Sequence, residues 1–237
     1  MAHLKLKPAL DGHKKISVND HFSKGNFLEM NSIAKKNLSS LIQGFSIKDI
    51  KGTLDREISS IAFDSRKIKK KSLFVAVPGL KENGFNFIND SISQGASAFI
   101  TEESVEGLSN IELNQDNVTA ICVEDCRKAL AWIGSKFYNQ PSNRIDLFGV
   151  TGTNGKTTTT YILDSIYKAQ KKISGIIGTI HYGYAGTNHS APITTPESLD
   201  INRMLDEMTE QKISQCFLEV SSHSLSLKRV HGMHFAV

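Results

Sequence analysis

The sequence predicts an α/β protein, in which a small N-terminal α/β domain is followed by a second domain with a mainly parallel sheet. Two observations lead to this prediction. Along residues 57–137, short apolar runs closed by turn residues alternate with helical spacing. From residue 144 onward, strands and helices alternate strictly, a pattern that favours right-handed crossovers between parallel strands. We expect a disordered tail at 1–29, a first domain at 30–125 and a second domain at 126–237.

In the first domain, the segment 30–45 spaces Ile33, Leu38, Leu41 and Ile42 like a short amphipathic helix. β-Branched and aromatic runs bounded by turn residues predict strands. A helix stopped by Gly95 lies among them, and Asp125 is expected to cap a longer helix that ends near the Pro/Ser/Asn cluster 139–143. The expected strands are 58–66, 72–79, 96–101 and 118–123, and the Gly95 helix spans 86–95.

In the second domain the expected elements follow one another in strict alternation. They are strand 144–151, helix 157–170, strand 174–180, helix 198–211 and strand 215–221. Because no later strand follows within the sequence, we expect an open sheet edge at strand 215–221. Such an edge is prone to pairing with other chains.

Bulk composition indicates a globular protein rather than a membrane protein. Hydrophobic residues make up 39% and charged residues 22% of the 237 residues, and no apolar run approaches the roughly 20 residues of a membrane helix. No signal peptide follows the basic N-terminus, and Met30 is an alternative start. Three cysteines form neither an even disulfide set nor a metal quartet, so we expect reduced thiols in the cytoplasm. They are Cys122, Cys126 and Cys216.

The net charge of +4 arises largely in residues 1–51, which contain nine lysines and four acidic residues. A solvated tail and a nucleic-acid-binding arm both fit such a segment. The lysines are scattered and no arginine lies among them, so the tail is favoured. We therefore expect neither a nucleic-acid partner nor a membrane partner, and we expect a monomer.

The stretch FGVTGTNGKTTTTY, residues 148–161, combines a strand, a glycine-rich loop and the start of a helix. Backbone N–H groups of such a loop and the helix N-terminus attract phosphates. Lys156 is placed to reach the β- and γ-phosphates, and the Thr157 hydroxyl to hold Mg²⁺. The general phosphate-loop signature requires glycine at 150, where this chain has Val150. The loop is therefore shorter, and the alternative is a structural strand–helix turn.

The string TGTNGKTTT resembles the ATP loop of the Mur ligases, a family that uses this shorter form. DSRKIKKKSLFVAVPG, residues 64–79, resembles the uridine-nucleotide domain of the MurE and MurF ligases. TTPES at 194–198 and LEVSSHSLSLKRV at 218–230 resemble the MurE branch. The resemblance implies a uridine-nucleotide domain followed by a truncated P-loop ATPase domain, with a further domain for the incoming amino acid.

The implied activity is ATP-dependent ligation. It adds a diamino acid, meso-diaminopimelate or L-lysine, to UDP-N-acetylmuramoyl-L-alanyl-D-glutamate through an acyl phosphate. The resemblance implies ATP and Mg²⁺ as cofactors. Two alternatives stay open: a non-catalytic nucleotide-binding module, and another ligase of the superfamily such as MurF or a folylpolyglutamate synthase.

The resemblance also assigns site residues by motif. Lys156 and Glu219 are expected to be catalytic, and Thr157 and Glu219 to hold the metal. The ATP loop comprises Gly152, Thr153, Asn154, Gly155, Lys156, Thr157 and Thr158. The substrate contacts are Phe63 and Ser65 at the uridine nucleotide, and Thr194, Thr195, Ser221 and Arg229 at the muramoyl peptide. Residues 80–82 are expected on a loop near the nucleotide.

Two of these residues also stand out on physical grounds. Glu219 ends an apolar strand, and ligands of parallel sheets bind beyond such ends. A carboxylate beside a phosphate loop is suited to Mg²⁺, although a salt-bridged glutamate is the alternative. Arg229 is suited to paired contacts with a carboxylate or phosphate, although a surface arginine is the alternative.

Overall fold

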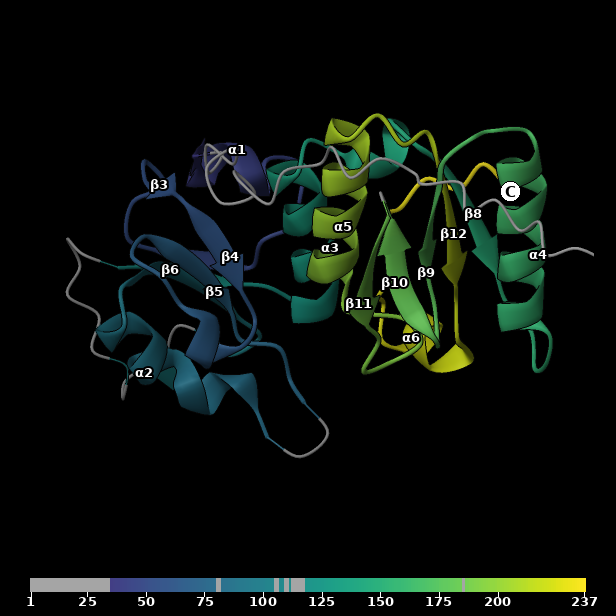
Figure 1. The fold of residues 1–237 in the computed structure, drawn as a ribbon. Coiled ribbons are helices and arrows are strands. Elements are labelled where there is room, and N and C mark those ends of the chain that lie inside the picture. The colour runs from purple at the N-terminus through teal and green to yellow at the C-terminus, as the bar shows by residue number, and fades with distance from the viewer. Residues whose placement is uncertain (1–34, 80–81, 105–106, 109–110, 112–117, 185) are drawn as a thin grey trace, which may run out of the picture. The chain divides into compact units, whose positions relative to one another are not determined.

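A computed structural model describes residues 35–79, 82–104, 107–108, 111, 118–184 and 186–237. The expected tail at 1–29 and residues 30–34 of the expected first domain lie outside the described residues. The described chain contains two five-stranded sheets with helices packed on them, so the α/β prediction is confirmed (Figure 1). Within this part of the chain, no helix is both long and apolar enough to span a bilayer.

The first sheet has the strand order β2-β7-β6-β5-β4. Strands β4 to β7 run parallel, and β2 joins β7 in the antiparallel direction. Helices α1 and α3 share one buried core with this sheet, and α2 packs into a second core together with Phe74 and Phe99. The bounds are β1 Lys36–Asn37, α1 Leu38–Ile42, β2 Asp49–Lys51, β3 Glu57–Ile58, β4 Ser60–Ala62, η1 Ser65–Lys67, β5 Ser72–Val75, η2 Gly84–Phe87, α2 Ile88–Ser93, β6 Ala96–Thr101, β7 Thr119–Cys122 and α3 Cys126–Phe137.

Two predicted helix boundaries in this region have clear local causes. Gly95 follows α2 with a φ of 109°, a conformation that favours glycine and ends the helix. The side chain of Asp125 caps α3 by accepting the N–H of Lys128 at 2.9 Å. Both the glycine stop and the aspartate cap could be predicted from the sequence, because each depends on a single residue.

The second sheet has the order β11-β10-β9-β12-β8. Strand β12 runs parallel to both neighbours, β8 and β9, whereas β10 is antiparallel to β9 and β11. The sheet is therefore mixed, and the β10–β11 hairpin was not predicted. The bounds are η4 Pro141–Asn143, β8 Asp146–Val150, α4 Lys156–Ala169, β9 Ser174–Ile177, β10 His181–Tyr184, β11 Thr187–Ser190, α5 Ser198–Glu210, β12 Gln215–Glu219 and α6 Ser222–Ser226.

The expectation of an open edge at strand 215–221 is wrong. Strand β12 lies in the middle of the sheet, because its crossover returns the chain to the space between β8 and β9. The outer side of β8 receives hydrogen bonds from the last residues, with Ala236 N–H donating to Leu147 O at 2.8 Å. Sequence order alone does not determine the spatial order of strands.

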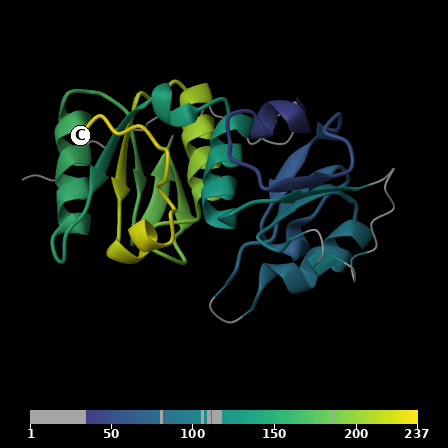
Figure 2. The same ribbon diagram turned by 180° about the vertical axis from the view of Figure 1, so that it is seen from behind.

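Helices α4 and α5 cover opposite faces of the second sheet (Figures 1 and 2). Alternation along β12 explains this arrangement, because successive side chains point to opposite faces. Phe217 packs among aromatic rings with Tyr167 of α4, at a centroid distance of 5.3 Å. Its neighbour Leu218 belongs to the core that contains Met204 and Met208 of α5. This two-sided packing fixes the position of Glu219 at the end of β12.

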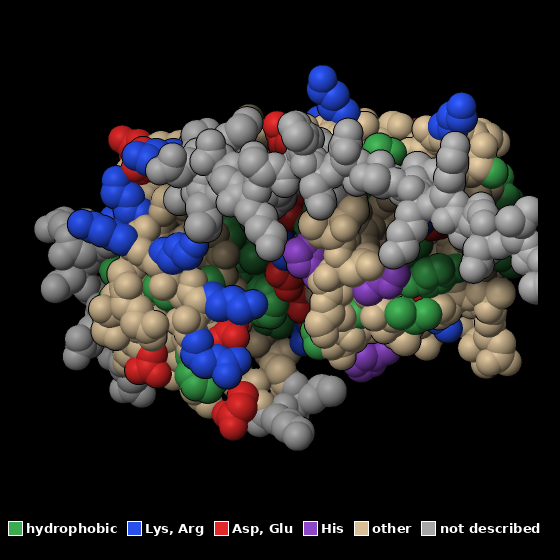
Figure 3. Space-filling model, viewed as in Figure 1, with side chains coloured by type: hydrophobic (Ala, Val, Ile, Leu, Met, Phe, Trp, Pro, Cys, Tyr) green, Lys and Arg blue, Asp and Glu red, His purple; other side chains and the backbone are tan. Residues whose placement is uncertain are grey.

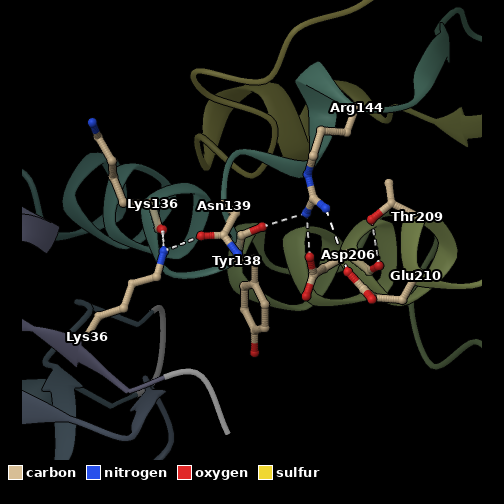
Figure 4. Close-up of polar contacts among 8 residues, drawn as sticks. All are labelled: Lys36, Lys136, Tyr138, Asn139, Arg144, Asp206, Thr209 and Glu210. Atoms are coloured by element: carbon tan, nitrogen blue, oxygen red, sulfur yellow. Dashed lines mark hydrogen bonds and ion pairs between the residues drawn. The ribbon is translucent and has the colours of Figure 1, made fainter. Parts of the chain in front are cut away.

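Polar contacts fix the connection between α3 and β8 (Figure 4). Arg144 donates to the carbonyl of Tyr138 at 2.9 Å and pairs with Asp206 of α5. Lys36 donates to the side-chain oxygen of Asn139 at 2.6 Å, and burial lowers the pKa of Lys36. Helix α3 shares one core with the first sheet and also packs on α5. The proposed boundary at 125/126 falls immediately before this shared helix.

Candidate nucleotide and acceptor site

The glycine-rich loop connects β8 to α4 and is exposed from residue 151 to residue 155. Gly152 and Gly155 have φ values of 139° and 83°, which side-chain-bearing residues rarely adopt. No side chain caps α4 at Gly155, so the first N–H groups of this helix are available to a ligand. Lys156 folds back over the loop and donates from Nζ to Gly152 O at 2.8 Å. The loop therefore places uncapped N–H groups at the start of α4 beside one cation, Lys156.

Glu219 lies at the carboxyl end of β12 and is fully buried, with 0% of its surface exposed. Its Oε2 accepts a hydrogen bond from the Thr157 hydroxyl at 2.9 Å, which places the carboxylate beside the first turn of α4. Among the described residues, no lysine, arginine or histidine forms an ion pair with Glu219. A buried carboxylate without a cation is costly unless it binds a metal or is otherwise paired. This geometry suits a divalent cation.

Thr179 supplies the other contacts of this carboxylate. Its backbone N–H donates to Oε1 of Glu219 at 3.1 Å, and its hydroxyl to Oε2 at 3.0 Å. The same hydroxyl lies 3.1 Å from the hydroxyl of Thr194. Gly178 lies against the same carboxylate, because a Cβ at that position would lie 2.2 Å from Oε1. Glycine is required there by the close approach of the carboxylate. We call Thr157, Gly178 and Thr179 together the cradle around the Glu219 carboxylate.

The residues predicted to contact the muramoyl peptide, Thr194, Thr195 and Ser221, lie close to Glu219. The Thr195 hydroxyl donates to the carbonyl of Glu219 at 2.7 Å and accepts the N–H of Ser221 at 3.1 Å. The Ser221 hydroxyl accepts the N–H of Ser224 and caps α6. Thr195 therefore contacts the backbone of Glu219, and Ser221 contacts Thr195. Thr194 lies beside Thr179, which in turn contacts the carboxylate.

Arg229 is held by two partners on the same loop. Its Nε and Nη2 both lie 2.8 Å from Oε1 of Glu197, and Nη1 donates to Thr195 O at 2.9 Å. The other oxygen of Glu197 faces Arg127 of α3 at 3.6 Å. These side chains are mostly buried, with 14% of Arg229 and 17% of Glu197 exposed. The guanidinium is thus rigidly oriented, as recognition of an anion requires.

Phe63 and Ser65 lie in the first domain, directly after β4, and both are half-buried. Ser65 begins η1, which is capped by Asp64, and the Arg66 guanidinium holds the pKa of Asp64 below its usual value. An exposed basic run at 66–71 follows, and Figure 3 shows Lys and Arg side chains gathered over this first sheet. Of the adjoining loop, Glu82 is described, whereas 80–81 lie outside the described residues.

The structure draws attention to three residues that the sequence reasoning did not assign. Gly178 and Thr179 lie in the last part of the predicted strand 174–180 and directly after β9, which ends at Ile177, and the rule that ligands bind beyond strand ends could have identified them. Glu197 lies in the quoted TTPES motif. No sequence signal indicated that its partner would be Arg229, because that contact spans 32 residues.

Two comparisons identify the family. Residues 150–237 match the Mur ligase middle domain, and residues 57–138 match the catalytic domain of the Mur ligase family. The chain belongs to the Mur ligase family.

Similar Mur ligases include proteins named UDP-N-acetylmuramoyl-L-alanyl-D-glutamate–2,6-diaminopimelate ligase. The protein of Alkaliphilus metalliredigens is 40% identical over 200 residues, which cover 84% of this chain and 39% of the relative. The protein of Clostridioides difficile is 40% identical over 198 residues, with 84% and 39% covered. This chain thus spans about two-fifths of the length of these relatives.

Solved Mur ligase structures share the fold. A structure of a ligase with the same name has a TM-score of 0.64 at 22% identity, covering 84% of this chain and 38% of that chain. A diaminopimelate–D-alanyl-D-alanyl ligase from Acinetobacter baumannii has a TM-score of 0.53 at 20% identity, covering 81% and 38%. The Mur ligase arrangement of two sheets therefore extends through the described residues.

Proposed function

We propose that this chain provides the ATP loop and the acceptor site of an ATP-dependent amide ligase in peptidoglycan precursor synthesis. The reaction adds a diamino acid to UDP-N-acetylmuramoyl-L-alanyl-D-glutamate through an acyl phosphate. The names of the relatives favour diaminopimelate over L-lysine as that amino acid. A cytoplasmic location and a monomeric state stay predictions.

One observation carries the proposal: the fully buried carboxylate of Glu219 faces Thr157 in the first turn after the glycine-rich loop. Mg²⁺ typically binds one or two carboxylates together with substrate phosphates. Among the described residues, no three His, Cys, Asp or Glu side chains gather into a metal cluster. A single carboxylate and a hydroxyl beside a phosphate loop fit Mg²⁺ that arrives with a nucleotide.

The roles of the residues follow from these positions. ATP, when bound, supplies the phosphoryl group that activates the acceptor carboxylate. The loop N–H groups would bind and orient the phosphates, and Lys156, which now contacts Gly152 O, would contact a phosphate oxygen and offset its charge. Thr157 and Glu219 would hold Mg²⁺. Thr153, Asn154 and Thr158 would border the phosphates.

The acceptor is proposed to lie along the residues that pack behind Glu219. Thr194, Thr195 and Ser221 would contact the muramoyl peptide, and Arg229 would bind one of its carboxylates. Phe63 and Ser65 would contact the uridine nucleotide at the end of β4. The orientation of Arg229 by Glu197 supports the anion-binding role, because a fixed guanidinium loses less freedom on binding.

The experiment is a calorimetric titration of the chain with Mg-ATP. Lys156→Ala is expected to weaken binding tenfold or more, since a charge-assisted phosphate contact contributes about 1.5–3 kcal/mol. Lys168→Ala is the matched control: it removes an exposed lysine of the same helix, paired with Asp164. Equal ATP affinity of wild type and Lys156→Ala would contradict the proposal.

A second titration tests the acceptor. Adding UDP-N-acetylmuramoyl-L-alanyl-D-glutamate to the isotopically labelled chain should shift the NMR signals of Ser65 and Ser221. Those of Thr187, on the exposed strand β11, should not move. No shift at either serine at millimolar ligand would contradict this part of the proposal.

A further inference from the structure

Thr179 contacts both oxygens of Glu219 at once. Its N–H donates to Oε1 at 3.1 Å and its hydroxyl donates to Oε2 at 3.0 Å. The terminal torsion of a glutamate has a broad, roughly two-fold energy profile, so the carboxylate plane is free to turn unless neighbours restrain it. Two donors from one residue, one for each oxygen, define that plane.

The Thr179 hydroxyl also lies close to a second residue, Thr194. This hydroxyl has one proton and two acceptors within reach, Oε2 of Glu219 at 3.0 Å and the Thr194 hydroxyl at 3.1 Å. The ionised carboxylate is the stronger acceptor of the two. The proton is therefore directed at Oε2, with Thr194 beside it.

The location of Thr179 makes its hydroxyl replaceable without opening a cavity in the core. Glu219 is fully buried, but Thr179 belongs to an exposed loop after β9. The stability cost of removing the hydroxyl is therefore limited to one hydrogen bond to a charged group. Removing the hydroxyl thus changes the surroundings of Oε2 while the backbone bond to Oε1 remains.

We propose that Thr179 is a positioning residue of the metal and nucleotide site, which fixes the carboxylate of Glu219 so that Oε2 faces Thr157. This inference rests on the proposed function, because it assumes that Glu219 and Thr157 bind Mg²⁺ together with ATP. Residues that orient metal ligands through hydrogen bonds typically change metal affinity by about 10–100-fold when replaced.

The test measures binding of ADP to the full chain by calorimetry over a series of Mg²⁺ concentrations. Thr179→Val keeps the shape of the side chain and removes the hydroxyl. It is expected to raise the Mg²⁺ concentration for half-maximal effect about tenfold or more. ADP affinity without metal should be unchanged, and the melting temperature should fall only by the loss of one hydrogen bond to a charged group. Thr179→Ser should restore the wild-type dependence, and Thr187→Val, at an exposed threonine on β11, should match the wild type.

The outcomes separate the inference from the function on which it rests. If the wild type binds ADP with a Mg²⁺ dependence that Thr179→Val leaves unchanged, Thr179 does not position the carboxylate. An equal loss of affinity with and without Mg²⁺ would also overturn the inference, since it would indicate a structural role. If the wild type binds no nucleotide, the proposed function fails, and this inference fails with it.

Discussion

Replacing Gly178 with alanine should force the carboxylate of Glu219 out of its position. The new Cβ would lie 2.2 Å from Oε1 and 2.8 Å from Cδ, closer than real Cβ contacts. Gly178 has no positive φ, so the backbone itself accepts alanine. The contact with Glu219 is therefore the cause of the expected effect.

The magnitude follows from the bonds that the displacement breaks. To reach an ordinary contact distance the carboxylate must retreat by about 1 Å or more, which removes the N–H bond from Thr179 at 3.1 Å. A hydrogen bond to a charged group contributes about 1.5–3 kcal/mol, and overpacking costs about 1–3 kcal/mol. Together these costs predict a loss of about 2.5–6 kcal/mol in the free energy of unfolding. For a chain of this size, at about 2–4 °C per kcal/mol, the melting temperature should fall by about 5–24 °C.

Urea unfolding of the two single variants, Gly178→Ala and Glu219→Ala, and of the double variant checks this reasoning. In the Glu219→Ala background the clash is absent, so Gly178→Ala should cost less than about 1 kcal/mol. Gly107→Ala is the control, because a Cβ at Gly107 meets neighbours at ordinary distances of 3.5–3.9 Å. An equal loss from Gly178→Ala in both backgrounds would refute the cradle around the carboxylate.

Three further changes test other parts of the structure. Glu197→Gln removes the carboxylate that pairs with Arg229 and should lower the free energy of unfolding by about 1–3 kcal/mol. The control Glu210→Gln, at an exposed glutamate, should change it by less than about 0.5 kcal/mol. Equal urea midpoints of the two variants would contradict this reasoning. Phe217→Ala empties a fully buried site and should cost about 3–5 kcal/mol by the same assay. Burial raises the pKa of Tyr138 to about 12, so its stabilising contribution is complete below about pH 10 and is lost as pH rises towards 12. Tyr138→Phe should therefore reduce the loss of stability between pH 9 and pH 11 by about 1 kcal/mol, and an unchanged pH profile would contradict the shift.

The sequence was most informative where one local signal decides the structure. Strand 96–101 was predicted with the bounds of β6, and the Asp125 cap predicted the first residue of α3. The loop glycines and Lys156 could be placed because strand, loop and helix are contiguous. Each of these features depends on residues within one turn of one another.

The β10–β11 hairpin had no comparable signal. Strand β11 is exposed along its whole length, so no alternation of apolar and polar residues marks it. The position of β12 between β8 and β9, and the pairing of Arg229 with Glu197, depend on contacts between distant parts of the chain. Neither the secondary-structure propensity of single residues nor the spacing of apolar residues indicates which distant segments will meet. The contacts around the Glu219 carboxylate could not be predicted for the same reason, because they join the ends of β9 and β12, which are far apart in the sequence.

The central position of β12 has a consequence for synthesis on the ribosome. Translation at about 5–20 residues per second delivers β8 and β9 seconds before Gln215, the first residue of the strand that joins them. Until then the facing backbone groups of β8 and β9 have no common partner. Glu219 ends β12 and closes the contact with Thr157. On the proposed function, the Mg²⁺-dependent part of the nucleotide affinity therefore arises only after β12 has joined the sheet.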